Sequence, residues 1–354
     1  MVTTTNPSSA SSQSEPLYPH YLPVRPEGFT PTLAVPPFDA AEPGLRADPA
    51  KPELLGAKGA SVQNITPRIG TEIRGVQLSA LSAAGLDQVA LLAAERGVLV
   101  FRDQDFADIG FDRQREIAEH YGPLHKHPTM GHPEATGPEF HVVYADEKVG
   151  TLRTLLGPRT TYDLWHIDQT FTPNTPSTTL FFALETPAGG CGGDTAFTSL
   201  TAAYAALSPA FRATLRPLSL VHTSASVGEV ARVGAERALR EAVSAVHPLV
   251  IEHPVTRAPA LFVNPTIARE VVGCLPEESA HVLGFLHAHV RSLDFSCRVR
   301  WEQGTVVVWD QVSFFFLVPL LPFSSWLVVV GASYLHFVMD SGPALPSLLV
   351  CGFC

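Results

Sequence analysis

Apolar residues recur at helical spacing in two stretches of the chain and form short unbroken runs elsewhere. From Leu81 to Arg96 they recur every three or four positions and Gly97 follows, which predicts a helix that ends at the glycine. Val98 to Phe101 are four consecutive apolar residues, typical of a buried strand. Only one helix is predicted among the later strands, from Glu277 to Val290, because Pro276 and early glutamates suit the first turn of a helix.

Beyond Arg159 the apolar runs are short, and proline and glycine separate them. Short strands with frequent turn residues are typical of a sandwich or jelly roll, whereas the strands of a parallel sheet alternate with helices. The predicted fold class is therefore mainly β with flanking helices. The strands expected in this part of the chain are 178–183, 195–198, 260–264, 298–301 and 305–309.

Proline is concentrated at the start of the chain, where 11 of the 31 prolines precede Glu53 among serine and threonine. Proline interrupts both helices and sheet ladders, because it lacks an amide hydrogen. We expect residues 1–60 to form a disordered or loosely docked arm, with folded structure beginning near Val62. This segment also lacks the basic start and apolar run of a secretory signal peptide, which predicts a cytoplasmic protein.

Composition narrows the classes of function. The chain has 354 residues, of which 45% are hydrophobic, so it can bury a large core. Its net charge is −10 and lysine and arginine are not clustered, which argues against nucleic acid as a partner. Five scattered cysteines favour a reducing compartment over a disulfide scaffold. The sequence leaves assembly into a homo-oligomer open.

The tetrapeptide Trp165-His-Ile-Asp168 is the strongest candidate for chemistry. Alternate residues of a strand point to the same face, so His166 and Asp168 can reach one metal ion while Ile167 packs behind them. Two histidines and one carboxylate form the iron(II) site of many non-haem oxygenases. His-x-Asp is also common at surfaces and in cores, so its neighbours in the sequence have to decide its role.

Several further motifs occur in order around this pair, and together they resemble a known family. They are Gly122-Pro-Leu-His-Lys-His-Pro128, Gly192-Gly-Asp-Thr195, His247-Pro-Leu-Val250, Leu261-Phe-Val-Asn264 and Arg300-Trp-Glu-Gln-Gly-Thr-Val-Val-Val-Trp-Asp310. From about Val62 to Asp310 the chain resembles the taurine dioxygenase family, particularly its fungal sulfonate dioxygenases. The resemblance implies a double-stranded β-helix, or jelly roll, over residues 61–310. It also implies Fe(II), 2-oxoglutarate and O2, and hydroxylation of a small sulfonate such as taurine with release of sulfite and an aldehyde.

The resemblance also implies roles for individual residues. His166 and Asp168 match the first two iron ligands, and Thr195 matches a threonine that hydrogen-bonds the 2-oxoglutarate carboxylate. His127 matches a histidine of the substrate pocket. Each has a structural alternative: Thr195 could simply follow a glycine-rich turn, and His127 could belong to a solvated histidine cluster or a separate zinc site.

The sequence after Asp310 departs from the family pattern. The family continues with Asn-Arg and then the distal iron-binding histidine, but Phe316 stands about where that histidine would be, and phenylalanine has no lone pair to donate. The family also has a later arginine that pairs with the distal carboxylate of 2-oxoglutarate, whereas this chain has no arginine after Arg300. In residues 311–354 the only charged side chain is Asp340. The tail therefore predicts a fold that is incomplete at the C-terminus and an impaired enzyme.

Three explanations of residues 311–354 compete. The tail could be a translated retained intron, since Val312-Ser313 is what an in-frame splice donor would encode. Residues 314–338 are long and apolar enough to span a bilayer, which would make the protein tail-anchored. Third, His336 could reach the site from an altered loop. Two other functions therefore stay open: a catalytically dead scaffold or tail-anchored binding protein, and a zinc hydrolase that uses His125, His127 and His166.

Overall fold

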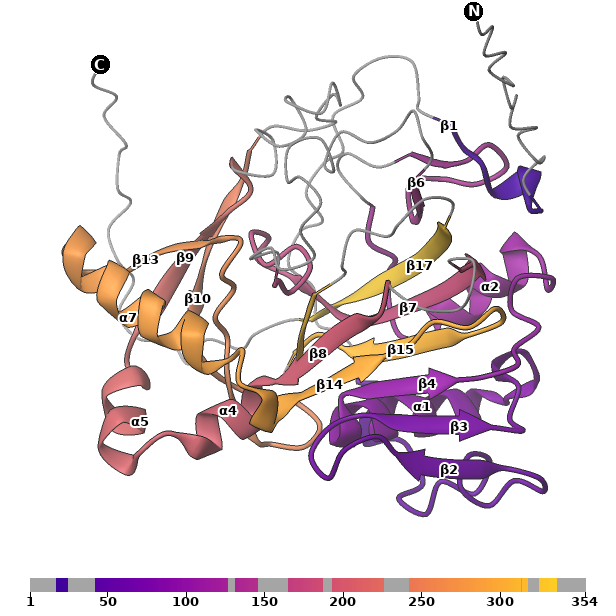
Figure 1. The fold of residues 1–354 in the computed structure, drawn as a ribbon, viewed down its shortest axis with the longest axis horizontal. Coiled ribbons are helices and arrows are strands. Elements are labelled where there is room, and N and C mark those ends of the chain that lie inside the picture. Colours follow the sequence, from indigo (N-terminus) through magenta and orange to yellow (C-terminus); the bar gives the residue numbers. More distant parts are fainter. Residues whose placement is uncertain are drawn as a thin grey trace, which may run out of the picture.

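A sheet of seven strands forms the centre of the fold in the computed structural model (Figure 1). The structure describes residues 17–24, 42–126, 131–145, 165–186, 193–225, 242–312, 314–317 and 325–335. Only β3 and β4 run parallel, and the other neighbouring strands of this sheet are antiparallel. In spatial order the strands are β2 (Ser61–Asn64), β3 (Thr71–Arg74), β4 (Val98–Phe101), β15 (Val306–Asp310), β7 (Thr175–Glu185), β17 (Ser325–Leu335) and β6 (Phe140–Ala145).

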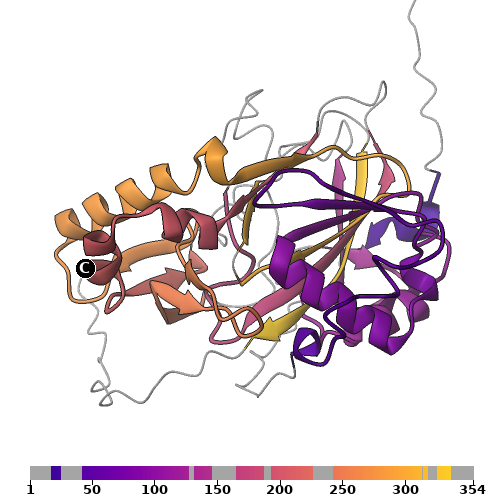
Figure 2. The same ribbon diagram turned by 90° about the horizontal axis from the view of Figure 1, so that it is seen from below.

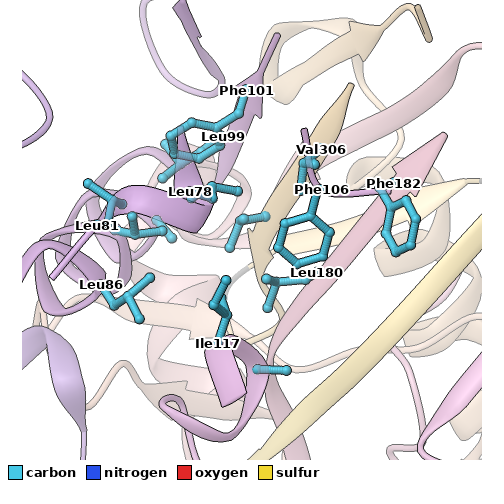
Figure 3. Packing of buried hydrophobic residues seen from close by; sticks show 14 of the residues in the cluster. Leu78, Leu81, Leu86, Leu99, Phe101, Phe106, Ile117, Leu180, Phe182 and Val306 are labelled. Atoms are coloured by element: carbon cyan, nitrogen blue, oxygen red, sulfur yellow. The ribbon is translucent and has the colours of Figure 1, made fainter. Parts of the chain in front are cut away.

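Alternation along the buried strands gives this sheet two apolar faces. On β4, Leu99 and Phe101 belong to one hydrophobic cluster, whereas Val98 and Val100 belong to another. The first face is covered by α1 (Ala83–Arg96) and α2 (Phe111–Glu119). Figure 3 shows this packing, in which Leu86 and Ile117 from the helices face the sheet residues. A strand buried on both faces needs apolar residues at every position, which explains why all four residues of β4 are apolar.

The opposite face of the large sheet packs against a second, three-stranded sheet. Phe181 and Trp309 of the large sheet lie in one cluster with Phe197 and Val299 of the small sheet. The aromatic rings meet edge to face, with 5.6 Å between the centroids of Phe197 and Trp309. The small sheet has the order β14-β8-β16, formed by Ser296–Val299, Thr195–Ser199 and Phe314–Leu317.

A third hydrophobic cluster lies to one side of the large sheet, where α7 and strands β9 and β10 are seen in Figures 1 and 2. It unites a three-stranded sheet, β10-β9-β13, with a two-stranded sheet, β11-β12, and with helices α4, α5 and α7. The elements are α4 (Leu200–Ala206), α5 (Pro209–Leu215), β9 (Ser219–Thr223), β10 (Ser244–Pro248), β11 (Val250–Glu252), β12 (Pro259–Leu261), β13 (Ala268–Val271) and α7 (Pro276–His289).

The mainly β architecture with flanking helices agrees with the sequence prediction. The predicted helices at 81–96 and 277–290 are confirmed as α1 and α7, and Gly97 ends α1 with a φ of 76°. The expectation of a single helix among the later strands is wrong, because α4 and α5 precede β9. Both are 7 residues long, too short to show a clear helical period in the sequence.

The prediction of a loosely docked arm over residues 1–60 is wrong for the part that the structure describes. Tyr21 and Leu54 are fully buried in the cluster between the helices and the large sheet. The Tyr21 hydroxyl donates to the carbonyl of Ala107 at 2.9 Å and accepts from Gln114 Nε2 at 2.5 Å. Folded structure therefore begins before Val62, because a few large side chains anchor a proline-rich segment that forms little regular structure.

The predicted incompleteness at the C-terminus is not confirmed. β16 pairs with β8 in the small sheet, and β17 lies between β7 and β6 in the large one (Figure 1). The tail therefore contributes a strand to each of the two facing sheets. Among the described residues no helix is long and apolar enough to cross a membrane, and the described parts of residues 314–338 are strands.

Ser82 is expected to contribute more to stability than an ordinary helix cap. Its hydroxyl accepts from the Gly85 amide at 3.1 Å and donates to Glu53 Oε1 at 2.6 Å, so it joins α1 to the N-terminal segment. Ser82→Ala should lower the free energy of unfolding by about 2 kcal/mol, the upper end for loss of a cap. Ser208→Ala is the control, because Ser208 caps α5 through Phe211 alone among the described contacts. Urea unfolding that shows equal losses for the two variants would contradict the role of Glu53.

Candidate functional site

His166 and Asp168 converge as expected for residues two apart in an extended segment, although residues 165–168 do not form a regular strand. Ile167 between them is fully buried in the third cluster, beside residues such as Phe262 and Val312. His166 Nε2 lies 3.4 Å from Asp168 Oδ1, and each side chain is 28% exposed. Two donor atoms that bind one metal ion at right angles, each about 2.1 Å from it, are about 3.0 Å apart. The pair therefore fits adjacent positions on one ion after a shift of a few tenths of an ångström.

Gln311, just after β15, holds the carboxylate of Asp168. Its Nε2 donates to Asp168 Oδ2 at 2.9 Å and also to Thr179 Oγ1, and its Oε1 accepts from the Asp168 amide at 2.8 Å. Gln311 itself is fully buried, and its own amide donates to the carbonyl of Ser177 at 2.8 Å. Asp168 Oδ2 is thus occupied by a protein donor while Oδ1 faces His166.

Polar side chains from neighbouring elements fix the backbone on both sides of the pair. Asn264 Nδ2 donates to the carbonyl of Ile167 at 2.7 Å and to Thr170 Oγ1 at 2.8 Å. The Thr266 hydroxyl donates to the carbonyl of Trp165 at 2.9 Å. His247 Nε2 lies 2.8 Å from the carbonyl of Thr170. A segment with few regular hydrogen bonds of its own is therefore held in one conformation from the neighbouring loop and strand.

The electrostatic surroundings favour an ionised carboxylate at Asp168 and a neutral imidazole at His141. Burial acts to raise the pKa of Asp168, but hydrogen bonding and charge from His166, together with the Gln311 donor, outweigh it and hold the pKa below its ordinary value. His141 on β6 also interacts with this carboxylate. Burial lowers the pKa of His141 to about 4 although the Asp168 charge opposes that shift. The Asp168 carboxylate is therefore held in the form that could donate a lone pair to a metal ion.

The structure describes two of the other candidate site residues, Thr195 and His125, but not His127. Thr195 is buried at the start of β8, and its Oγ1 accepts from the indole nitrogen of Trp301 at 2.9 Å, which leaves its own hydrogen for a second partner. His127 lies outside the described residues. His125 is buried, with 7% of its surface exposed, and is therefore not part of a solvated cluster.

Phe316, which stands about where the resemblance would place the distal histidine, lies on β16. In that strand Phe316 pairs with Phe197 of β8, two residues from Thr195. Within the part of the chain that the structure describes, no group of three or more His, Cys, Asp and Glu side chains could hold a metal ion. The described residues thus fit two positions on an iron ion and do not supply a third.

Comparison with known proteins decides the family. The family described as "Taurine catabolism dioxygenase TauD, TfdA family" matches residues 61–314 of this chain. The chain belongs to this family. The predicted resemblance is thereby confirmed, and with it the class of the enzyme, an oxidoreductase of the 2-oxoglutarate-dependent dioxygenases.

Proteins from fungi are similar in sequence to most of the chain. The alpha-ketoglutarate-dependent dioxygenase cnsM of Penicillium expansum is 46% identical over 300 residues, which are 84% of this chain and 82% of the relative. The alpha-ketoglutarate-dependent sulfonate dioxygenase of Saccharomyces cerevisiae is 37% identical over 300 residues, 83% of this chain and 71% of the relative. Alpha-ketoglutarate is another name for 2-oxoglutarate, so the family's use of this cosubstrate and of O2 agrees with the sequence prediction.

Solved structures support the predicted jelly roll. The crystal structure described as a putative alpha-ketoglutarate-dependent taurine dioxygenase from Burkholderia xenovorans superimposes with a TM-score of 0.64 and 25% identity, covering 81% of this chain and all of that one. A second taurine dioxygenase from the same organism gives a TM-score of 0.61 at 25% identity, over 79% of this chain and 93% of that one.

Sequence reasoning missed the residues that hold the pair in place. Asn264 is part of one of the motifs and Gln311 directly follows another, but nothing in the sequence pointed to their contacts with the segment from Ile167 to Thr170. Asn264 ends a motif otherwise composed of apolar residues, Leu261-Phe-Val. A polar side chain in such a place has to find a buried partner, and that was the available signal.

Proposed function

We propose that His166 and Asp168 are two of the ligands of an Fe(II) ion that, with 2-oxoglutarate and O2, serves to hydroxylate a small sulfonate. The observation that carries the proposal is the convergence of His166 Nε2 and Asp168 Oδ1 at 3.4 Å, in a chain of the dioxygenase family. Such a bound centre would supply the oxidant for a C–H bond, and the protein would supply position and surroundings. Thr195 is the proposed contact for the 2-oxoglutarate carboxylate.

The substrate class rests on the relatives. A relative at 37% identity is named as a sulfonate dioxygenase, and solved structures at 25% identity are described as taurine dioxygenases. The name of the relative at 46% identity states the cosubstrate and no substrate. A small sulfonate such as taurine is therefore the first substrate to test, with His127 as the proposed pocket residue.

We further propose that this chain is impaired. Phe316 on β16 stands about where the resemblance would place the distal histidine, and no arginine follows Arg300 to pair with 2-oxoglutarate. The described residues offer no third side chain for the ion. An ion bound by only two side chains should dissociate readily into solvent. Without the arginine, 2-oxoglutarate also lacks one of its binding residues.

The purified chain should convert 2-oxoglutarate to succinate slowly even with Fe(II), ascorbate, O2 and taurine. Binding itself is expected: anaerobic addition of Fe(II) and 2-oxoglutarate should give the weak visible charge-transfer band of their chelate. Absence of this band at millimolar Fe(II) would contradict the proposed metal site. Full turnover, comparable to that of a relative assayed in parallel, would contradict impairment.

Restoring a histidine at position 316 should strengthen metal binding. Phe316→His adds an imidazole at the strand position that matches the missing ligand and should tighten Mn(II) binding about 10-fold or more, since each coordinated imidazole adds a strong donor. Phe315→His is the matched control, because successive residues of a strand point to opposite faces. Mn(II) titration followed by electron paramagnetic resonance measures both. Equal tightening in the two variants would show that position 316 has no special relation to the site.

A further inference from the structure

Gln311 has every polar group of its side chain committed at the candidate site. One amide hydrogen goes to Asp168 Oδ2 and the other to Thr179 Oγ1, while Oε1 accepts the Asp168 amide. The residue is fully buried and its backbone amide is bonded to Ser177 on β7. A glutamine so fixed cannot turn away without leaving several buried polar groups without a hydrogen-bond partner.

These contacts treat the two oxygens of Asp168 differently. Oδ2 accepts from Gln311 at 2.9 Å, whereas Oδ1 lies on the side of His166, 3.4 Å from Nε2. A free aspartate can rotate about two side-chain bonds and can bind a cation through one oxygen or both. The bonds from Gln311 remove most of that freedom, because one glutamine side chain contacts both the backbone amide and the Oδ2 oxygen of Asp168.

We propose that Gln311 is a positioning residue that makes Asp168 present a single oxygen, Oδ1, to a divalent cation shared with His166. This inference rests on the proposed metal site and adds what orients it. A carboxylate restricted to one oxygen occupies one position on the ion and leaves the neighbouring position for other ligands. A carboxylate that bound through both oxygens would take two positions.

The place of Gln311 in the fold suits this role. It follows β15, the strand that lies between β4 and β7 at the centre of the large sheet. Thr179, its second acceptor, is fully buried on β7. The side chain therefore connects the proposed metal-binding segment to a fully buried residue of the sheet. Gln311 also precedes Phe316 and the rest of the tail in the sequence.

The test is anaerobic titration of the full chain with Co(II) in the presence of 2-oxoglutarate, followed by visible absorption. Gln311→Met keeps the length of the side chain and removes its hydrogen bonds. It should weaken Co(II) binding about 10- to 100-fold, the range found when a group that orients a metal ligand is lost. The d–d bands of Co(II) should also change in position or intensity, because a released carboxylate can bind through both oxygens and alter the coordination number.

Two further variants separate positioning from folding. Gln104→Met removes comparable hydrogen bonds from a buried glutamine that bonds to the Val76 and Arg102 carbonyls, and it should leave Co(II) affinity and spectrum unchanged. Thr179→Val keeps Gln311 but removes its second acceptor, and should weaken binding in the same direction by a smaller factor. It also serves if Gln311→Met does not fold.

The outcomes distinguish this inference from the proposed function. If the wild-type chain binds Co(II) and both Gln311→Met and Thr179→Val retain its affinity and spectrum, the positioning role is wrong and the metal site stands. If the wild-type chain does not bind Co(II), the metal site and the positioning role both fail. Equal weakening by Gln104→Met would assign the effect to general destabilisation and would overturn the positioning role.

Discussion

Replacing His166 by alanine is expected to reduce the affinity of the chain for Fe(II), Mn(II) or Co(II) by more than about 100-fold. A loss of about 100-fold is the upper end of what is found when a residue that only orients a metal ligand is removed. The expected loss is larger here because the described residues supply only two donors, His166 Nε2 and Asp168 Oδ1. One remaining carboxylate cannot hold a divalent ion against water. Isothermal titration with Mn(II) and 2-oxoglutarate measures the change.

The control for this variant is His281→Ala. His281 is exposed on α7, and its Nδ1 lies 2.7 Å from the carbonyl of Glu277 in the same helix, away from the proposed site. Its removal should leave metal affinity and folding unchanged. If His166→Ala binds Mn(II) as tightly as the wild-type chain and His281→Ala do, then His166 is not a ligand. The proposal would then have to be abandoned.

Because of Glu42, the free energy of unfolding is expected to decrease by about 3 kcal/mol as the pH rises from about 4.5 to about 7. The figure follows from the rise in the pKa of Glu42, since each pKa unit corresponds to about 1.36 kcal/mol. Glu42 lies just before a 3-10 helix, Pro43–Leu45. Burial and the nearby charge of Asp310 raise its pKa from 4.5 to about 7, although His253 opposes the shift. In this window the folded chain keeps a proton that the unfolded chain has lost, so the free energy of unfolding decreases as the pH rises.

His253, which interacts with both Glu42 and Asp310, also makes the free energy of unfolding decrease as the pH rises. Burial would lower the pKa of His253, but Asp310, 3.2 Å away, and the charge of Glu42 raise it above its ordinary value. The stabilisation from the charged pair is complete below the ordinary pKa of histidine and is lost as the pH rises through the raised value. This loss begins near the ordinary histidine pKa of 6.5, so it overlaps the upper end of the Glu42 window and extends the decline to higher pH.

Glu42→Gln separates the two contributions. Glutamine stays neutral, so the variant should lose most of the dependence between about pH 4.5 and pH 7. It should keep a smaller decline at higher pH, because Asp310 still raises the pKa of His253 when the Glu42 charge is gone. Urea unfolding at a series of pH values measures this, with Glu119→Gln, an exposed glutamate of α2, as the control. A wild-type curve that rises with pH across that window, or one that Glu42→Gln leaves unaltered, would contradict the assignment.

The sequence predicted those features that depend on neighbouring residues in the chain. The apolar run from Val98 to Phe101 gave a strand buried on both faces, and Gly97 gave the end of α1. The order of the motifs gave the family, since each motif keeps its local pattern. The convergence of His166 and Asp168 was predicted because residues two apart on a strand share a face, and the burial of Ile167 confirms that alternation.

Only the tertiary structure revealed what depends on residues far apart. Gln311 and Asp168 are 143 positions apart, and Tyr21 and Gln114 are 93 apart. Periodicity says which face of an element is buried, but it does not say which distant side chain lies opposite a given carboxylate. That depends on the order of strands in the sheets, which places β15 beside β7 and β16 beside β8. The chain thus determined locally that a metal-binding pair could form, and the strand order determined what holds it.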